Sequence, residues 1–177
     1  MIFHIDDEPL SVCLGEITMI HSPPVRGGSQ TMNNFNETAD RALQAMKQRA
    51  MELNVKGVAT VAASEGDRVQ SWLSKMLVVN ALKKEPIKDD PGMNLIAVAY
   101  SKAAEMADTL RASGSGVRPP LKGEFGWEGG VIAKGKAGYL LATFSGGSGA
   151  DDVKISQAGL AILAEALYPG SPANLTQ

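Results

Sequence analysis

The chain has 177 residues, with 17 Lys and Arg against 19 Asp and Glu, and its formal net charge is −2 at pH 7. Domains of about 150 residues are common, so this length predicts one compact domain with extensions. The near balance of charge argues against nucleic acid as a partner, because affinity for a phosphate backbone comes largely from clustered positive charge.

The histidine and cysteine content limits the chemistry further. His4 and His21 are the only histidines, which excludes a histidine-based catalytic or metal centre in the main body. Cys13 is the only cysteine, so neither an internal disulfide nor a Cys-x-x-Cys metal site can form. No stretch reaches the roughly 20 apolar residues of a membrane span, and residues 6–8 are acidic where a secretory signal would be basic. We therefore expect a cytoplasmic protein with no metal site and no membrane contact.

Residues 1–33 are expected to form an N-terminal arm and linker. Residues 22–34 are rich in Pro, Gly and polar side chains and show no apolar period. Leu10–Ile20 has the Val, Ile and Leu content of a strand, which would need a sheet edge or a neighbouring subunit to pair with. Three interpretations stay open: an arm folded over its own domain, an arm exchanged between protomers, or an artefact of start-codon choice with Met32 as the working start.

The main domain is expected over residues 34–168. An apolar stripe with helical spacing begins after Asn36, a good N-cap, and continues to Leu53. A strand over Gly57–Ser64 and a second over Arg68–Met76 then predict a hairpin. Leu77–Pro91 is expected to be a loop around a short helical turn.

The second half is expected to contain another helix, another hairpin and a last helix. A helix over about Met93–Ser113 precedes strands over Gly130–Ala133 and Gly138–Ser145, and a last helix ends at Leu167. Ala158–Ala164 is apolar on nearly every side, which suggests that a subunit contact covers its second face. Helices alternating with hairpins predict an α+β fold, followed by a C-terminal tail over residues 169–177.

Two glycine-dense loops are candidate ligand contacts. The loop at residues 145–152 joins a strand to a helix, an arrangement that points backbone N–H groups at an anion. It lacks the spacing of nucleotide-binding loops, and Asp151 and Asp152 in the first helical turn would repel phosphate. A tight turn with a helix cap is the alternative interpretation. In the loop at residues 123–130, Phe125 or Trp127 could stack on a flat ligand, or both could plug the core.

Three ionisable residues complete the candidates. Lys102 falls at the edge of the apolar stripe of its helix, so a solvated, an ion-paired and a ligand-contacting side chain are all open. Glu124 and Glu128 could form an acid/base pair with Lys102, provided that all three lie within reach of one substrate.

The order of several short motifs resembles the GlcG/HbpS-like family, also called the haem-degrading domain family. The motifs are the lysine-bearing helix Ala99–Ala107, Gly129-Gly130 before Val131-Ile132, Ser145-Gly146-Gly147, Asp151-Asp152 and Ala158-Gly159-Leu160. They span about residues 36–167. The sequence departs from the family pattern at Ala63–Asp67, where an Asp-x-Gly-Gly turn is usual, and in the long loop over residues 77–92.

The resemblance implies a profilin-like three-layer α/β/α fold with a five-stranded antiparallel sheet, assembled into dimers or larger rings. It also implies binding or degradation of haem or another tetrapyrrole. Without a histidine in the body, iron ligation would fall to Tyr100, Tyr139, Lys102, a methionine, or a histidine of the arm.

These observations give one leading hypothesis and two alternatives. The leading one is an oligomeric small-molecule-binding protein with haem or another tetrapyrrole as ligand. An assembly module without catalysis and an enzyme acting on a small hydroxy acid are the alternatives, so the sequence leaves catalysis undecided. The expected ligand contacts lie between the second helix and the glycine loops: Lys102, Phe125, Trp127, Gly129, Gly130, Gly146 and Gly147.

Overall fold

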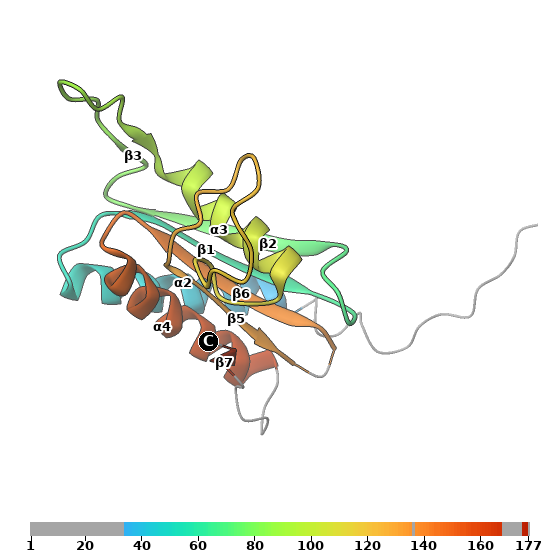
Figure 1. Ribbon diagram of the computed structural model, residues 1–177. Coiled ribbons are helices and arrows are strands. Elements are labelled where there is room, and N and C mark those ends of the chain that lie inside the picture. Colours follow the sequence, from blue (N-terminus) through green and yellow to red (C-terminus); the bar gives the residue numbers. More distant parts are fainter. Residues whose placement is uncertain (1–33, 136, 168–174, 177) are drawn as a thin grey trace, which may run out of the picture.

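The fold combines helices with an antiparallel sheet, as the α+β prediction states (Figure 1). The computed structural model describes residues 34–135 and 137–167, together with the backbone of residues 175–176. The predicted arm strand Leu10–Ile20 and most of the tail lie outside the described residues. None of the helices described here combines the length and the apolar character needed to cross a membrane.

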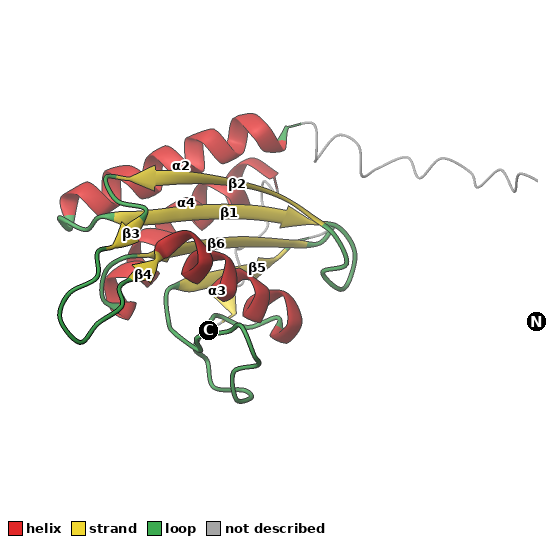
Figure 2. Cartoon of the chain, turned by 90° about the horizontal axis from the view of Figure 1, so that it is seen from above, coloured by secondary structure: helices red, strands yellow, loops and turns green. Residues whose placement is uncertain are grey.

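The main sheet has the strand order β2-β1-β6-β5-β7, with every pair antiparallel. Its four long strands form two hairpins, and the two-residue β7 pairs with β5. A separate ribbon of two short strands, β3 and β4, lies above one end of the sheet (Figure 2). The strands are β1 (Gly57–Ser64), β2 (Trp72–Val79), β3 (Lys83–Lys84), β4 (Met93–Asn94), β5 (Gly130–Lys134), β6 (Tyr139–Ser145) and β7 (Leu175–Thr176).

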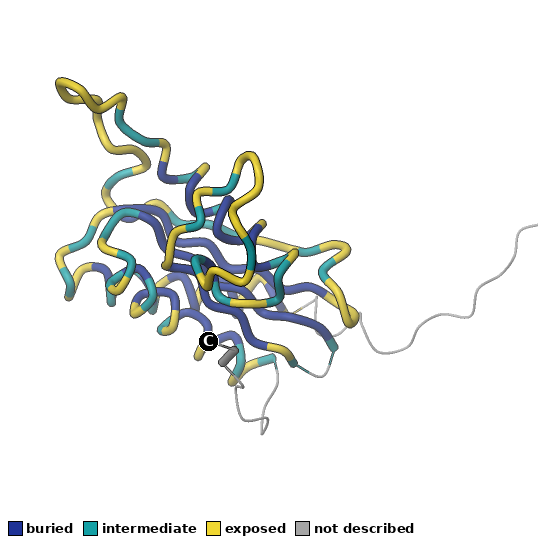
Figure 3. The backbone as a smooth tube through the Cα atoms, in the orientation of Figure 1, coloured by how far each residue is buried: buried dark blue, intermediate teal, exposed yellow. Residues whose placement is uncertain are grey.

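Helices cover both faces of the sheet. Helices α2 (Phe35–Glu52) and α4 (Gly149–Leu167) lie on one face, and α3 (Leu95–Thr109) lies on the other (Figure 2). The alternation of strand side chains explains this arrangement, because successive residues point to opposite faces. Every residue of β1 and β6 is accordingly buried, and the sheet forms the buried centre in Figure 3.

Several predicted boundaries need correction. Helix α2 begins at Phe35, with Asn34 rather than Asn36 at the N-cap position and no side-chain capping bond. Strand β2 begins at Trp72, because residues 65–71 are used in the turn from β1. Residues 77–91 contain no helical turn. These residues instead form the end of β2 and strand β3, which pairs with β4.

The apolar second face of α4 is covered within the chain. Helix α2 packs along α4, and Gly159 permits a close approach, since a Cβ there would lie 2.6 Å from Met46 Cγ. Leu160 and Leu163 are fully buried in the same cluster. The feature that suggested a subunit contact therefore has an explanation inside one protomer.

Candidate functional site

A buried ion pair joins helices from opposite faces of the sheet. The Lys102 ammonium of α3 donates to Asp152 Oδ2 of α4 at 2.9 Å and to the Phe144 carbonyl oxygen at 2.7 Å. The two side chains are only 3% and 5% exposed. Of the three interpretations of Lys102, the structure therefore supports the ion-paired one directly.

The glycine loop before α4 completes the partners of Asp152. The Gly147 N–H donates to Asp152 Oδ1 at 2.9 Å, so each carboxylate oxygen has a partner. Ser148 precedes α4 and caps it, since its hydroxyl accepts from the Asp151 N–H at 3.2 Å. This confirms the tight turn and cap that were one interpretation of the loop.

Gly129 makes the close approach of Lys102 and Asp152 possible. Its φ of +127° belongs to the region that favours glycine, and a Cβ there would collide with Lys102 Nζ and lie 2.7 Å from Asp152 Cβ. The Gly129 carbonyl accepts from Ser156 Oγ at 2.6 Å and from the Phe144 N–H at 3.1 Å. Lys102, Gly129, Gly147 and Asp152, which come from four of the motifs and lie far apart in sequence, thus meet at one place.

Burial shifts both members of the pair toward neutrality. Desolvation lowers the pKa of Lys102, and the opposite charge of Asp152 works against this shift. Desolvation raises the pKa of Asp152, and Lys102 and the N–H groups of Gly146 and Gly147 oppose it. Each group therefore depends on its partner to stay charged.

A hollow of about 420 Å³ opens beside this pair. This volume falls within the range of roughly 300–1,000 Å³ typical of small-molecule pockets. The wall comes from α3, the β3–β4 ribbon, the loop before β5 and the loop before α4. The lining residues are Lys84, Met93, Leu95, Lys102, Gly114, Gly126, Trp127, Glu128, Ser145, Gly146, Gly147, Gly149 and Asp152. We call this hollow the Lys102 pocket.

The structure brings most of the predicted ligand contacts to this pocket. Lys102, Trp127, Gly146 and Gly147 line it directly, and Gly129 touches Lys102 beside it. Phe125 is not part of the wall. It stacks against Trp127 with ring centroids 4.8 Å apart, and both rings are 43% exposed.

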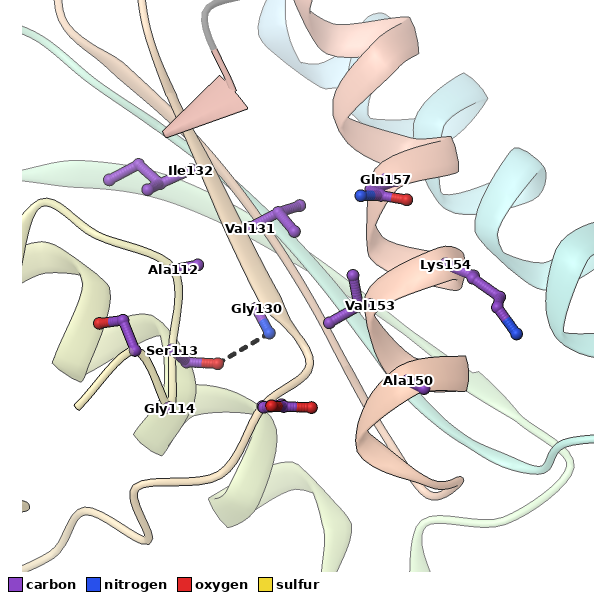
Figure 4. Close-up of a pocket in the computed structure, with 12 residues that line it drawn as sticks. Ala112, Ser113, Gly114, Gly130, Val131, Ile132, Ala150, Val153, Lys154 and Gln157 are labelled. Atoms are coloured by element: carbon purple, nitrogen blue, oxygen red, sulfur yellow. Dashed lines mark hydrogen bonds between the residues drawn. The ribbon is translucent and has the colours of Figure 1, made fainter. Parts of the chain in front are cut away.

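Gly130 belongs to a second hollow, of about 450 Å³, between β5 and α4 (Figure 4). There its N–H bonds to Ser113 Oγ at 2.8 Å, the dashed line in the figure. Val131 and Val153 give this hollow a largely apolar wall. The predicted set is therefore divided between two hollows, which share Gly114 and Glu128 in their walls.

Glu124 lines neither hollow, and its carboxylate is already hydrogen-bonded to other residues. Both its oxygens accept from the Arg118 guanidinium, at 2.6 and 2.8 Å, and one also accepts from the Leu121 N–H at 2.7 Å. Hydrogen bonding to Arg118 and Leu121 lowers the pKa of Glu124 to about 2. A carboxyl group this acidic is a poor general acid or base near neutral pH, so the proposed pair with Glu128 is not supported.

Sequence reasoning missed Lys84 and Met93. They are directly paired in the β3–β4 ribbon, where Lys84 lies opposite Met93. The signal in the sequence was Asp90-Pro91-Gly92, a turn at which Gly92 has a φ of +77° and a Cβ would meet the Pro86 nitrogen at 2.8 Å. That turn brings Met93 back beside Lys84 and both of them to the pocket.

Comparison with known proteins adds a structural likeness. No protein-family model and no curated protein matches the chain. Among solved structures, the chain is similar to the crystal structure of the PduOC:heme complex, with a TM-score of 0.54 and 16% sequence identity. The match covers 80% of this chain and 96% of that one. The likeness shows a shared fold.

The ion pair predicts a large loss of stability in a single variant. Lys102→Met leaves Asp152 buried without a counter-charge and should lower the free energy of unfolding by about 3–5 kcal/mol. Lys102→Met combined with Asp152→Leu should cost less than the sum of the two single changes, because no buried charge remains. Urea unfolding measures all three variants.

Lys154→Met is the matched control for that series, because it removes a second lysine–aspartate pair, which lies on the surface of α4 with side chains 51% and 33% exposed. It should leave the unfolding midpoint nearly unchanged. Equal losses for Lys102→Met and Lys154→Met would contradict the role given to the buried pair.

The Arg118–Glu124 contact predicts protection of its loop from protease. Glu124→Gln removes the charge that holds Arg118, so trypsin should cut at the exposed Lys122 faster than in the unaltered chain. Because the folded pKa of Glu124 is lowered to about 2, its contribution is complete above the ordinary value near 4.5 and is lost only as pH falls through about 2. Glu128→Gln, in the same loop, should leave the cleavage rate unchanged, and equal rates for the two variants would refute the assignment.

Proposed function

We propose that the Lys102 pocket binds a planar ligand that carries carboxylates, of the tetrapyrrole class, with haem as the first candidate. The observation that carries the proposal is the convergence of Lys102, Trp127, Gly146 and Gly147 on one hollow of ligand size. The shared fold with a protein crystallised in complex with haem supports the choice of ligand.

Two lysines of the pocket can attract a carboxylated ligand, against the opposing charges of Asp152 and Glu128 in the same wall. An ammonium group has three N–H donors, and Lys102 uses two of them on Asp152 and Phe144. The third can be donated to a ligand carboxylate. Lys84 supplies a second, exposed cation in the same wall. The Lys102 charge itself is largely offset by Asp152, so Lys84 is the more effective attraction for an anion.

The aromatic residues suit a flat ligand. Phe125 and Trp127 form a tilted stack, and their partial exposure leaves apolar ring surface for a further planar group. The Phe125 N–H donates to Ser101 Oγ of α3 at 3.1 Å, which fixes this loop against the helix. Trp127 is thereby held as part of the pocket wall.

The positions of the candidate side chains limit which of them could ligate haem iron. Tyr139 lies away from the pocket with its hydroxyl donating to the Asp67 carbonyl, and Tyr100 lies near Ser74. The Lys102 ammonium is bound to Asp152 and is therefore not available as an iron ligand. Among the described lining residues, the Met93 thioether is a neutral soft donor of the kind that ligates haem iron in some cytochromes. Bound haem would supply iron redox chemistry, while the chain's residues orient the ring and neutralise its carboxylates.

The same proposal includes self-association into a dimer or larger ring, which the family resemblance implies. Catalysis is not part of it, since Glu124 is unavailable as a partner for Glu128 and Lys102.

The stacking role of Trp127 predicts a selective loss of affinity. Trp127→Leu should raise the Kd for haemin about threefold to tenfold, because an aromatic contact contributes roughly 0.5–1.5 kcal/mol beyond its area. Titration followed at the Soret band measures this. The matched control is Trp72→Leu, since the second tryptophan lies on β2 and outside the pocket wall. An unchanged Soret band in the parent protein, or equal losses in both variants, would end the tetrapyrrole proposal.

The iron-binding role of Met93 predicts a difference between haemin and its iron-free porphyrin. Haemin should bind more tightly than the free porphyrin, and Met93→Leu should remove most of that difference while leaving porphyrin affinity unchanged. Met51→Leu is the control, because Met51 is exposed on α2 at the other face of the sheet. Equal preference for haemin in Met93→Leu would assign the iron to another ligand.

A further inference from the structure

The two edges of the main sheet differ in how they are protected. At the β5 edge, the Ser113 N–H donates to the Gly130 carbonyl at 3.2 Å, the Gly130 N–H donates to Ser113 Oγ, and β7 pairs with Ile132 and Ala133. At the opposite edge, β2 pairs only with β1 among the described residues. An open strand edge is a template for another strand.

Strand β2 also has the length and composition of a docking strand. It has eight residues, of which Leu73 and Val78 are 42% and 38% exposed. Edge strands that remain open usually carry charges, proline or bulges that block pairing. Here Lys75 is the only charged side chain in β2, and it is bound to Asp40 of α2 at 2.7 Å.

The start of α2 lies beside the start of β2. Residues 53–56 join the end of α2 to Gly57, and Gly57 pairs with Val79 at the end of β2. The 18 residues of α2 span about 27 Å, and the eight residues of β2 span about 26 Å. The helix therefore runs along β2 and has its first turn at the Trp72 end, as Figure 2 shows.

We infer that the segment Leu10–Ile20 of the same chain docks on the open edge of β2 as an antiparallel strand. The sequence gives this segment strand composition without a partner of its own. Antiparallel docking places Ile20 at the Trp72 end, close to where α2 begins. Residues 21–33 can span up to roughly 43 Å, so they bridge this short gap easily, and the short linker gives the arm of the same chain an advantage over that of a second copy.

The single cysteine reports on this geometry. Cys13 lies seven residues before Ile20, about 23 Å along an extended strand. With Ile20 opposite Ser71, just before Trp72, Cys13 lies directly opposite Val78 and on the same face of the sheet. A disulfide forms only when the two Cα atoms are within about 7 Å. Val78→Cys should therefore trap the docked arm, whereas Ser74→Cys, exposed on the same strand about 13 Å away, should not.

The experiment is mild oxidation of the two full-length variants, followed by mass measurement and thiol titration. Val78→Cys is expected to form an intrachain disulfide in the monomer, with a yield roughly tenfold above that of Ser74→Cys. A disulfide that links two chains would assign the arm to another copy, and preferential trapping by Ser74→Cys would reverse the strand direction. A disulfide in neither variant would mean that the arm does not dock in this register. Each of these results overturns the inference.

Two further measurements keep the test decisive. In the Cys13→Ser background, Val78→Cys should stay reduced, and a dimeric disulfide there would show that β2 meets a second copy instead. Leu14→Pro removes a strand N–H from the arm and should speed hydrogen exchange of the β2 amides, with β1, paired on both sides, as internal reference. Unchanged exchange in β2 would also overturn the inference.

Discussion

The ion pair between Lys102 and Asp152 constrains the arrangement of all three layers. Side chains of helices on opposite faces of a sheet can touch only beyond its strand ends or its edges, and Lys102 and Asp152 meet near the end of β6, at the Phe144 carbonyl. Removing two charges from water costs several kcal/mol per ion, so such a pair persists only with good geometry and further hydrogen bonds. The Phe144 carbonyl and the Gly147 N–H supply those bonds. The position of the pocket follows from this meeting point.

The same pair explains why these short motifs do not imply one ligand. Gly129 leaves the space that Lys102 Nζ occupies, the loop at Gly147 donates to the carboxylate, and Asp152 stands in the first turn of α4. These residues satisfy one another inside the protein, so a fold can retain them for packing alone. At 16% identity, the likeness to PduOC accordingly concerns the fold. Under the proposed function, ligand choice would depend on the less constrained parts of the wall, above all Trp127, Lys84 and Met93.

Local patterns predicted the elements better than their partners. The strand Gly57–Ser64 and the last helix ending at Leu167 follow from apolar spacing, and the structure confirms both. Helical periodicity placed Lys102 at the edge of the apolar stripe of its helix but did not identify its partner. Asp152 lies 50 residues further along the chain, and no local sequence pattern predicts a contact over that separation. Glu124 failed as a catalytic candidate although its partner lies nearby in sequence, because an irregular loop has no periodicity that would place the two side chains together. A carboxylate in a glycine-rich loop looks available until Arg118, six residues earlier, is seen to bind it on both oxygens.

The pocket and the open strand edge lie on separate parts of the fold. No residue of β2 lines the Lys102 pocket, and the pocket wall is built from α3, the β3–β4 ribbon and the two glycine loops. Strand β1 stands between β2 and β6, so an arm docked on β2 would extend the sheet without changing the hydrogen bonds of Phe144. Ligand binding and edge protection can therefore vary independently in this fold. A change in the arm can likewise leave the buried ion pair intact.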